Sequence, residues 1–171
     1  MTSTLHEGAN AATRTDPTTT VRIAAPRAAV FDVLLDPRSY PDWLLGAQKI
    51  RKVDPDWPAV GSSFHHTVGV GPIKVSDHTD IVSVDRPDQL VLRAHIGPFG
   101  AARVTFTLAE PAGDTGAGGE TVVEMREVPD AGPIRLVWWT VGRWALAVGI
   151  WGRNEVTLEN LKRYVESRAA G

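Results

Sequence analysis

The sequence predicts an α+β fold in which a curved antiparallel sheet of about seven strands wraps around a long C-terminal α-helix. Three observations support this fold class. A strand and two short helices come first, six strand-like segments with hairpin-length connections follow, and a long amphipathic helix ends the chain. The 171 residues fit one domain, and we expect it over residues 18–171, after a disordered tail at 1–17 that is rich in Thr, Ala and small polar residues.

The first elements follow from alternation and from proline placement. Period-two alternation over Thr18–Ala24 is typical of a half-buried strand. Pro26 suits the first turn of a helix, and this helix should end before Pro37, because proline disfavours helical geometry in the residue that precedes it. A second short helix is expected over Tyr40–Leu45.

The middle of the chain, as far as Val128, is predicted to be β-structure. Turns rich in Gly, Pro and Asp separate six expected strands, which are Ile50–Val53, Ser62–Gly69, Ile73–Val84, Gln89–Ile96, Ala101–Leu108 and Thr121–Val128. The Gly-rich stretch 113–119 lacks the Gly-Lys-Ser/Thr ending of a phosphate loop, so we interpret it as a hairpin tip.

The C-terminal helix is the strongest periodic pattern in the sequence. Between about Gly149 and Arg168 apolar residues recur at helical spacing, namely Trp151, Val156, Leu158, Leu161, Tyr164 and Val165. The preceding stretch 134–151 is largely apolar and contains four of the six tryptophans. A spanning helix needs about 20 apolar residues with few charges. Because Arg135 and Arg143 interrupt this stretch, we expect no transmembrane segment.

Composition argues against several classes of function. The formal net charge is -2 and the Lys and Arg residues are scattered, which disfavours a nucleic-acid partner. The absence of cysteine excludes disulfides, thiolate metal sites and cysteine nucleophiles. No secretory signal pattern opens the chain, so a cytoplasmic location is expected. Monomer and homodimer both remain open.

Four stretches at the joints of these elements carry a family resemblance. They are Val21–Pro26 followed by Val30-Phe31, Asp36–Trp43, Asp77–Val82 and Arg153–Leu161. Together they resemble the helix-grip superfamily known as SRPBCC or START-like, in its polyketide cyclase/dehydrase-like branch. The resemblance implies an elongated hydrophobic cavity between the sheet and the long helix, which would bind a small hydrophobic molecule, lipid-like or polyaromatic. Function inferred from a shared fold is an analogy.

Strand parity predicts which side chains line this cavity. The more apolar set of each strand should face inward, because the opposite face meets water. To these strand residues we add Trp43, which the family motif places at the cavity edge, and Trp138 and Trp151, which could form an aromatic entrance to the cavity. The expected ligand-contacting residues are Trp43, Phe64, His66, Val68, Val75, Asp77, Thr79, Leu92, Phe106, Met125, Trp138 and Trp151.

Three ionisable residues, His66, Asp77 and Glu127, fall on the inward sets and are the candidate catalytic residues. A buried carboxylate beside an imidazole can move protons, as a cyclase or dehydratase requires. The alternative is structural, since a bulge or a strand end would place them in water. Ligand binding without catalysis is the first hypothesis and a cofactor-independent cyclase/dehydratase the second. The third is docking of the aromatic segment 134–151 on a membrane surface or a protein partner.

Histidines raise the question of a metal site, because His65, His66, His78 and His95 lie on predicted strands. Adjacent residues of a strand point to opposite faces, so at most one of His65 and His66 can join a given internal site. The sequence has no His-Glu-X-X-His pattern. We therefore predict no metal site and no cofactor.

Overall fold

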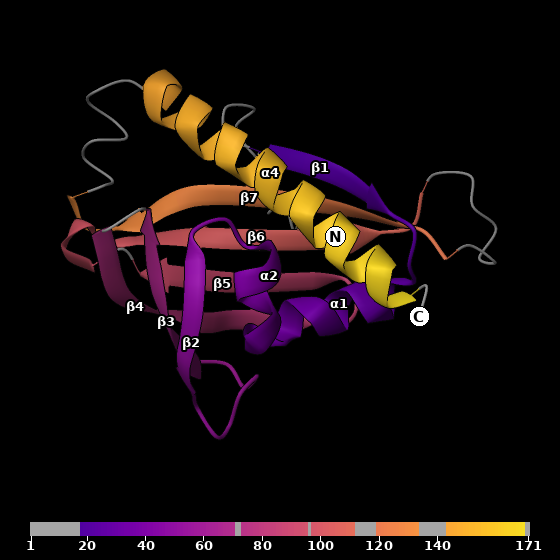
Figure 1. Cartoon of the computed structure of the whole chain (residues 1–171), viewed down its shortest axis with the longest axis horizontal. Helices are drawn as coiled ribbons and strands as arrows, with labels where there is room; N and C mark the ends of the chain where they lie inside the picture. Colours follow the sequence, from indigo (N-terminus) through magenta and orange to yellow (C-terminus); the bar gives the residue numbers. More distant parts are fainter. Residues whose placement is uncertain (1–17, 71–72, 96, 112–118, 134–142, 170–171) are drawn as a thin grey trace, which may run out of the picture.

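The computed structural model describes residues 18–70, 73–95, 97–111, 119–133 and 143–169. The expected N-terminal tail, most of the Gly-rich loop and the first half of the aromatic segment lie outside these ranges. One seven-stranded antiparallel sheet has the order β1-β7-β6-β5-β4-β3-β2. The long helix α4 (Arg143–Ala169) crosses one face of this curved sheet (Figure 1). The predicted helix-grip architecture is confirmed.

The elements occur in the predicted order. Strand β1 (Thr18–Ile23) is followed by α1 (Arg27–Leu35), the 3-10 turn η1 (Pro37–Ser39) and α2 (Tyr40–Trp43). The remaining strands are β2 (Ala47–Val53), β3 (Ser63–Val70), β4 (Ile73–Asp85), β5 (Gln89–His95), β6 (Ala101–Ala109) and β7 (Thr121–Ala131), with η2 (Gly97–Phe99) between β5 and β6.

The joint between α1 and η1 follows the proline rule. Helix α1 ends before Asp36, whose backbone is extended, and the Asp36 side chain accepts a hydrogen bond of 3.0 Å from the Arg38 N–H. This carboxylate caps the next turn, while Pro37 needs no backbone partner there. The chain therefore turns tightly, and α1 lies near the C-terminal end of α4 while α2 lies below the middle of that helix (Figure 1).

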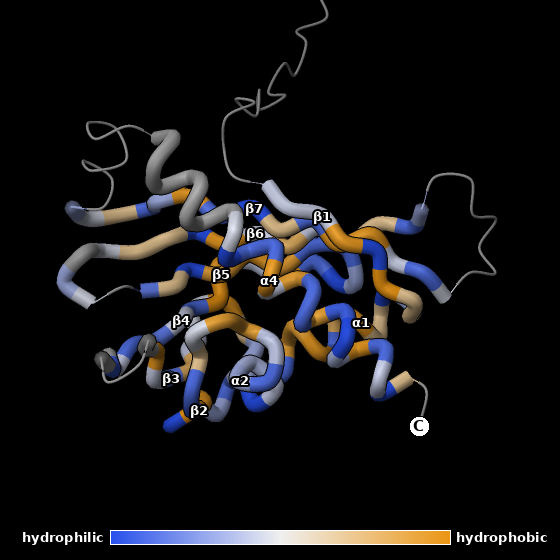
Figure 2. Tube along the Cα trace, turned by 45° about the horizontal axis from the view of Figure 1, so that its top comes forward, coloured by the Kyte–Doolittle hydropathy of each residue, from blue (hydrophilic) through white to orange (hydrophobic). Residues whose placement is uncertain are grey.

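The hydrophobic core lies between the concave face of the sheet, α1, α2 and α4. Figure 2 shows hydrophobic residues, in orange, along the strands and helices that border this interior. The largest fully buried side chains include Phe31, Trp43, Phe64, Phe106 and Leu158. The end of α4 is also tied to the sheet edge, because the Ala24 N–H donates to Glu166 Oε1 at 2.8 Å.

Helix α4 differs from its prediction in two respects. It begins at Arg143 rather than near Gly149, because Trp144–Ile150 includes good helix formers and one internal glycine costs only about 1 kcal/mol. Val156, which we expected on the apolar face, is 45% exposed. It lies about 200° around the helix from Leu158, which is fully buried, so the two side chains must point in opposite directions.

Candidate ligand site on the concave face

Most residues predicted to contact a ligand lie on the concave face. The cross-strand pairs Phe64–Thr79 and His66–Asp77 join β3 to β4. The predicted residues that are buried are Trp43, Phe64, His66, Asp77, Thr79, Leu92, Phe106 and Met125. Val68 is half-buried. The side chains of Val75 and Trp151, and the whole of Trp138, lie outside the described residues.

An aromatic band connects α2 to His66. The ring centroids of Trp43 and Tyr40 are 4.6 Å apart, those of Tyr40 and Phe64 are 4.9 Å apart, and those of Phe64 and His66 are 5.2 Å apart. Trp43 also meets Phe106 edge to face, with centroids 6.4 Å apart. We expected Trp43 at the cavity edge, but it is only 1% exposed and packs inside the core. The band supplies aromatic surface next to a polar imidazole.

His66 is buried with one ring nitrogen unused. Its Nε2 lies 3.1 Å from Thr79 Oγ1, and its Nδ1 has no hydrogen-bond partner among the described residues. Burial lowers the pKa of His66, the charge of Asp77 opposes this shift, and the charge of Arg51 adds to it. The imidazole is therefore neutral near pH 7, with Nδ1 free to exchange a hydrogen bond.

Asp77 does not form an acid–base pair with His66, although the two residues are cross-strand partners. Its Oδ1 accepts from the His78 N–H at 2.9 Å and its Oδ2 accepts from the Gly97 N–H at 2.6 Å. Both carboxylate oxygens are thus held by the backbone. This arrangement anchors the turn after β5 and leaves His66 without a carboxylate relay.

Glu127 lies apart from the other two candidates. It is buried on β7, three strands away from Asp77 on β4, which corresponds to about 14 Å along the sheet at 4.8 Å per strand. Its Oε2 accepts from Arg153 Nη2 of α4 at 2.7 Å. The structure therefore does not bring the three candidate residues together. Strand parity placed each on the correct face, but it carries no information about distance across the sheet.

Asn154 is a site residue that our sequence reasoning missed. It is fully buried on α4, and neither Oδ1 nor Nδ2 has a partner among the described residues. The buried stripe of α4 consists of Asn154, Thr157, Leu158, Leu161 and Val165. Asn154 precedes Leu158 by four positions and Leu161 by seven, so helical spacing places it on the same stripe. A polar residue at a position where the pattern expects an apolar one was the signal that could have identified it.

A separate groove of about 400 Å³ lies at the other end of α4. Its lining includes Asp32 and Val33 of α1 together with Tyr164, Val165 and Arg168 of α4. Arg168 donates to the Tyr164 hydroxyl at 2.9 Å. Tyr164 follows Asn154 by ten positions, about 15 Å along a helix, so this groove is distinct from the concave-face site.

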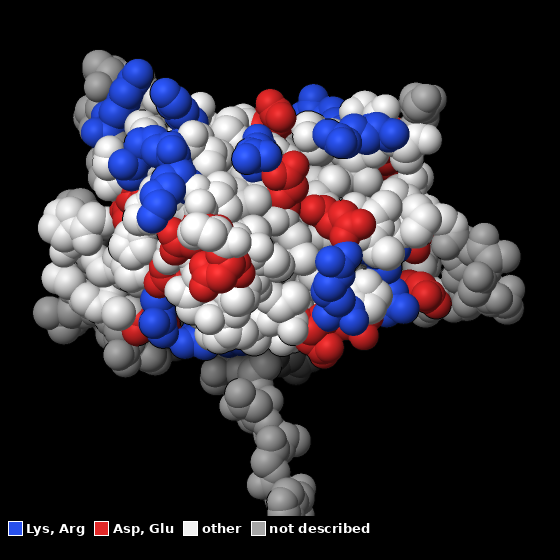
Figure 3. Space-filling model, turned by 90° about the horizontal axis from the view of Figure 1, so that it is seen from below, with Lys and Arg blue, Asp and Glu red and all other residues white. Residues whose placement is uncertain are grey.

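Surface features bear on the remaining expectations. On the face shown in Figure 3, several Lys and Arg side chains gather at the upper left, while elsewhere Lys and Arg lie near Asp and Glu side chains. Among the described residues, no helix combines the length and the apolar character needed to cross a membrane. The first half of the aromatic segment 134–151 lies outside the described residues, and only the backbone of its second half is described.

Comparisons with solved structures support the fold class. The di-domain ARO/CYC StfQ from the steffimycin biosynthetic pathway has a TM-score of 0.66 at 13% identity, with 92% of this chain and 52% of that chain covered. This chain thus spans about half of that di-domain protein. Protein SA2116 of unknown function from Staphylococcus aureus gives 0.63 at 8% identity, covering 91% of this chain and 98% of that one. A third, the di-domain ARO/CYC BexL from the BE-7585A pathway, gives 0.61 at 16% identity, covering 87% and 49%.

The curved sheet, the long helix and the interior between them define a helix-grip protein of the SRPBCC type. A family described as polyketide cyclase / dehydrase and lipid transport matches residues 14–166, which is well over half of the sequence. The chain belongs to this family. No curated protein gave a match.

Proposed function

We propose that this domain binds a small, mostly apolar ligand between the concave face of the sheet and α4, and that buried polar groups recognise a polar substituent of that ligand. The observation that carries the proposal is Asn154, which is fully buried and whose two amide atoms have no partner in the part of the chain that the structure describes. Leaving a buried amide unpaired costs about 1–3 kcal/mol in proteins. Such a group is easier to explain as a ligand contact than as packing.

The surroundings favour an aromatic ligand with hydroxyl or carbonyl groups. The aromatic band offers ring faces and edges, and His66 Nδ1 offers a second buried hydrogen-bonding atom. Ligand pockets combine mostly apolar linings with few placed polar groups in this way. Two of the similar folds are ARO/CYC proteins of biosynthetic pathways, which supports a polyaromatic ligand over a plain lipid.

Binding can be tested with two probes, 1,8-dihydroxyanthraquinone and palmitate, in calorimetric titrations of the full chain. We expect the hydroxylated polyaromatic probe to bind, and Asn154→Leu to weaken it by about tenfold through the lost hydrogen bonds. Asn160→Leu is the matched control, because Asn160 is on the same helix and its Oδ1 already accepts from Arg163. Failure of both probes to bind, together with native mass spectra showing no apolar compound on protein from its own host, would refute the proposal.

Catalysis of a cyclase/dehydratase type is the second candidate, and it is favoured by a neutral His66 whose Nδ1 has no partner among the described residues. In an aldol cyclisation, Nδ1 would take a proton from the methylene carbon between two carbonyl groups. That carbon would then attack a ketone carbon, and the imidazolium would return the proton to the new alkoxide. Loss of water would give the ring double bond.

The test uses a poly-β-ketone thioester as the probe and follows aromatic absorbance. Wild-type chain should accelerate ring formation and His66→Gln should not, while His66→Gln should still bind 1,8-dihydroxyanthraquinone, more weakly than wild type because one ligand contact is changed. Equal rates for the two proteins would leave binding as the function and reject His66 as the base.

A further inference from the structure

The convex face of the sheet, opposite the proposed ligand site, carries a row of three histidines. His65 of β3 and His78 of β4 are cross-strand partners, with ring centroids 5.7 Å apart. His78 stacks on His95 of β5, with centroids 3.8 Å apart and planes at 17°. Asp80 lies two residues along β4 from His78 and therefore on the same face. His78 and Asp80 of β4 and His95 of β5 therefore bring two imidazoles and one carboxylate together from two neighbouring strands.

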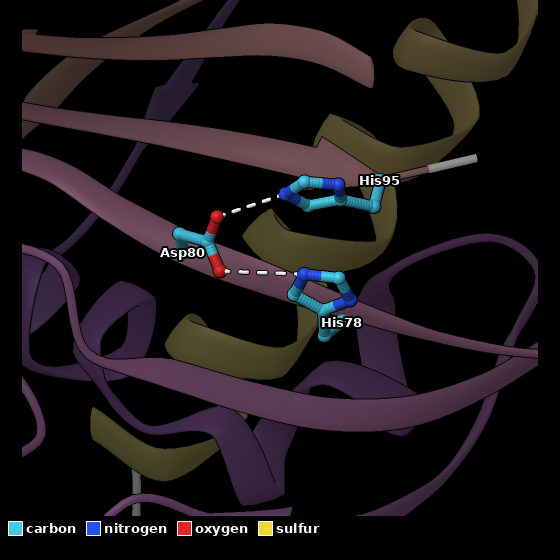
Figure 4. Close-up of side chains that lie close together, drawn as sticks. All are labelled: His78, Asp80 and His95. Carbon is cyan, nitrogen blue, oxygen red and sulfur yellow. Dashed lines mark hydrogen bonds and ion pairs between the residues drawn. The ribbon is translucent and has the colours of Figure 1, made fainter. Parts of the chain in front are cut away.

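The nitrogen and oxygen atoms of this cluster converge (Figure 4). His95 Nε2 lies 2.8 Å from Asp80 Oδ2, and His78 Nε2 lies 3.8 Å from Asp80 Oδ1. One atom from each of the three residues can be chosen so that all lie within 4.8 Å of one another. Ligand atoms around a tetrahedral Zn²⁺ with bonds of 2.0–2.2 Å are about 3.3–3.6 Å apart, so the widest pair of ligand atoms would have to close by up to about 1.5 Å.

Ser63 and Asp77 contact two of these side chains, and because the His78 and His95 rings are stacked, one ring must turn for both imidazoles to bind the same ion. Ser63 Oγ donates to Asp80 Oδ1 at 2.8 Å. Asp77 Oδ1 lies 3.7 Å from His78 Nδ1, on the ring nitrogen away from Asp80. Metal-bound imidazoles usually direct their second nitrogen at a carboxylate or a carbonyl group, which fixes ring orientation. The three side chains are 25–39% exposed, so an ion can reach them from solvent.

Charge also favours a cation here. Arg93 is the cross-strand partner of Asp80, but its Nε donates to Asp130 at 2.7 Å, and Asp130 also accepts from Arg103. The Arg93 guanidinium is therefore directed to another carboxylate. Within the described residues, Asp80 contacts the Ser63 hydroxyl and the imidazoles of His78 and His95, none of which carries a permanent positive charge.

We propose that His78, Asp80 and His95 form a surface site for a divalent transition-metal ion of the zinc type, with its remaining coordination positions filled by water. Two imidazole nitrogens and a carboxylate oxygen are ligands that Zn²⁺ and Cu²⁺ accept readily. The site would cross-link β4 and β5 at the level of His66 without touching the concave face. It is independent of the proposed ligand binding.

The test is calorimetric titration of tag-free full-length protein with ZnCl₂, supported by thermal unfolding with and without the ion. We expect one Zn²⁺ per chain and a rise in melting temperature, because an ion that binds only the folded chain stabilises it. His78→Gln and His95→Gln should each weaken binding by about tenfold or more. Both side chains are partly exposed, so the variants should fold, and circular dichroism checks this.

His65→Gln is the matched control. His65 belongs to the same row, but it is not one of the three converging residues. Unchanged affinity in His65→Gln supports the site. Equal weakening in all three variants would mean a diffuse histidine patch and would overturn the proposal. Absence of Zn²⁺ binding, or full binding by His78→Gln, would overturn it as well.

Discussion

Replacing Asn154 with leucine should stabilise the ligand-free protein. The Asn154 side chain is fully buried, and its two polar atoms have no partner among the described residues. Leucine keeps the same branching at Cγ but carries no polar atoms. Removing an unpaired amide should gain about 1–3 kcal/mol, from which the slightly larger side chain removes up to about 1 kcal/mol by crowding.

The net expectation is about 1–2 kcal/mol of added stability, which corresponds to about 2–8 °C in melting temperature for a chain of this size. Urea unfolding followed by circular dichroism measures the change, and an unchanged m-value shows that the folded and unfolded states are comparable. A gain in stability together with a loss of probe binding would be the signature of a functional residue that is costly to the fold.

Thr121→Val is the matched control for this reasoning. Thr121 is equally buried, but its hydroxyl donates to the Ala25 carbonyl at 2.7 Å. Valine preserves the shape and leaves that carbonyl unpaired, so stability should fall by about 0.5–1.5 kcal/mol. The two substitutions are therefore expected to have opposite signs. If Asn154→Leu destabilises the protein while Thr121→Val behaves as expected, the Asn154 amide has a structural role and the reasoning fails.

Three further outcomes follow from the structure. Gly100→Ala should lower the free energy of unfolding by at least about 3 kcal/mol or prevent folding. The reason is that Gly100 has a φ of +118° and that an added Cβ would lie 1.9 Å from the Ala131 carbonyl oxygen. Normal expression and an unchanged urea midpoint would contradict this. Arg153→Ala should lower the free energy of unfolding by about 2 kcal/mol, because buried Glu127 would lose its partner. Adding Glu127→Gln should recover part of that loss. A double variant no more stable than Arg153→Ala would show that the unpaired charge is not the cause. Burial lowers the pKa of His66 below its ordinary value of 6.5, so the unfolded chain takes up a proton on this residue at a higher pH than the folded chain does. The free energy of unfolding is therefore greatest above pH 6.5 and decreases as the pH falls below that value. Urea midpoints should accordingly fall more steeply between about pH 7.5 and 5 for wild type than for His66→Gln. Parallel slopes would show that His66 does not titrate differently in the two states.

The fold could be derived from local patterns because each local signal agreed with the whole. Proline placement marked the ends of α1, turn residues separated the strands, and the C-terminal periodicity marked α4. Parity also placed His66, Asp77 and Glu127 on the buried face, where the structure finds all three. These inferences need only the period of the backbone and the position of turn residues, both of which are local properties.

Relations across the sheet could not be derived in this way. The separation of Glu127 from Asp77 depends on strand order, and the partners of the Asp77 carboxylate are backbone groups that no side-chain pattern reveals. The convex cluster shows the same limit, because His78 and Asp80 are close in sequence while His95 reaches them only through the pairing of β4 with β5.

The sequence by itself determined the helix-grip class, the element order and the inward or outward direction of most side chains, since these depend on periodicity and turn chemistry. Only the tertiary structure decided which polar groups meet. It paired Glu127 with Arg153, left Asn154 and His66 Nδ1 without described partners, and brought His78, Asp80 and His95 together. The physical reason is that hydrogen bonding and ligation act over about 3 Å, a distance set by how strands and helices pack.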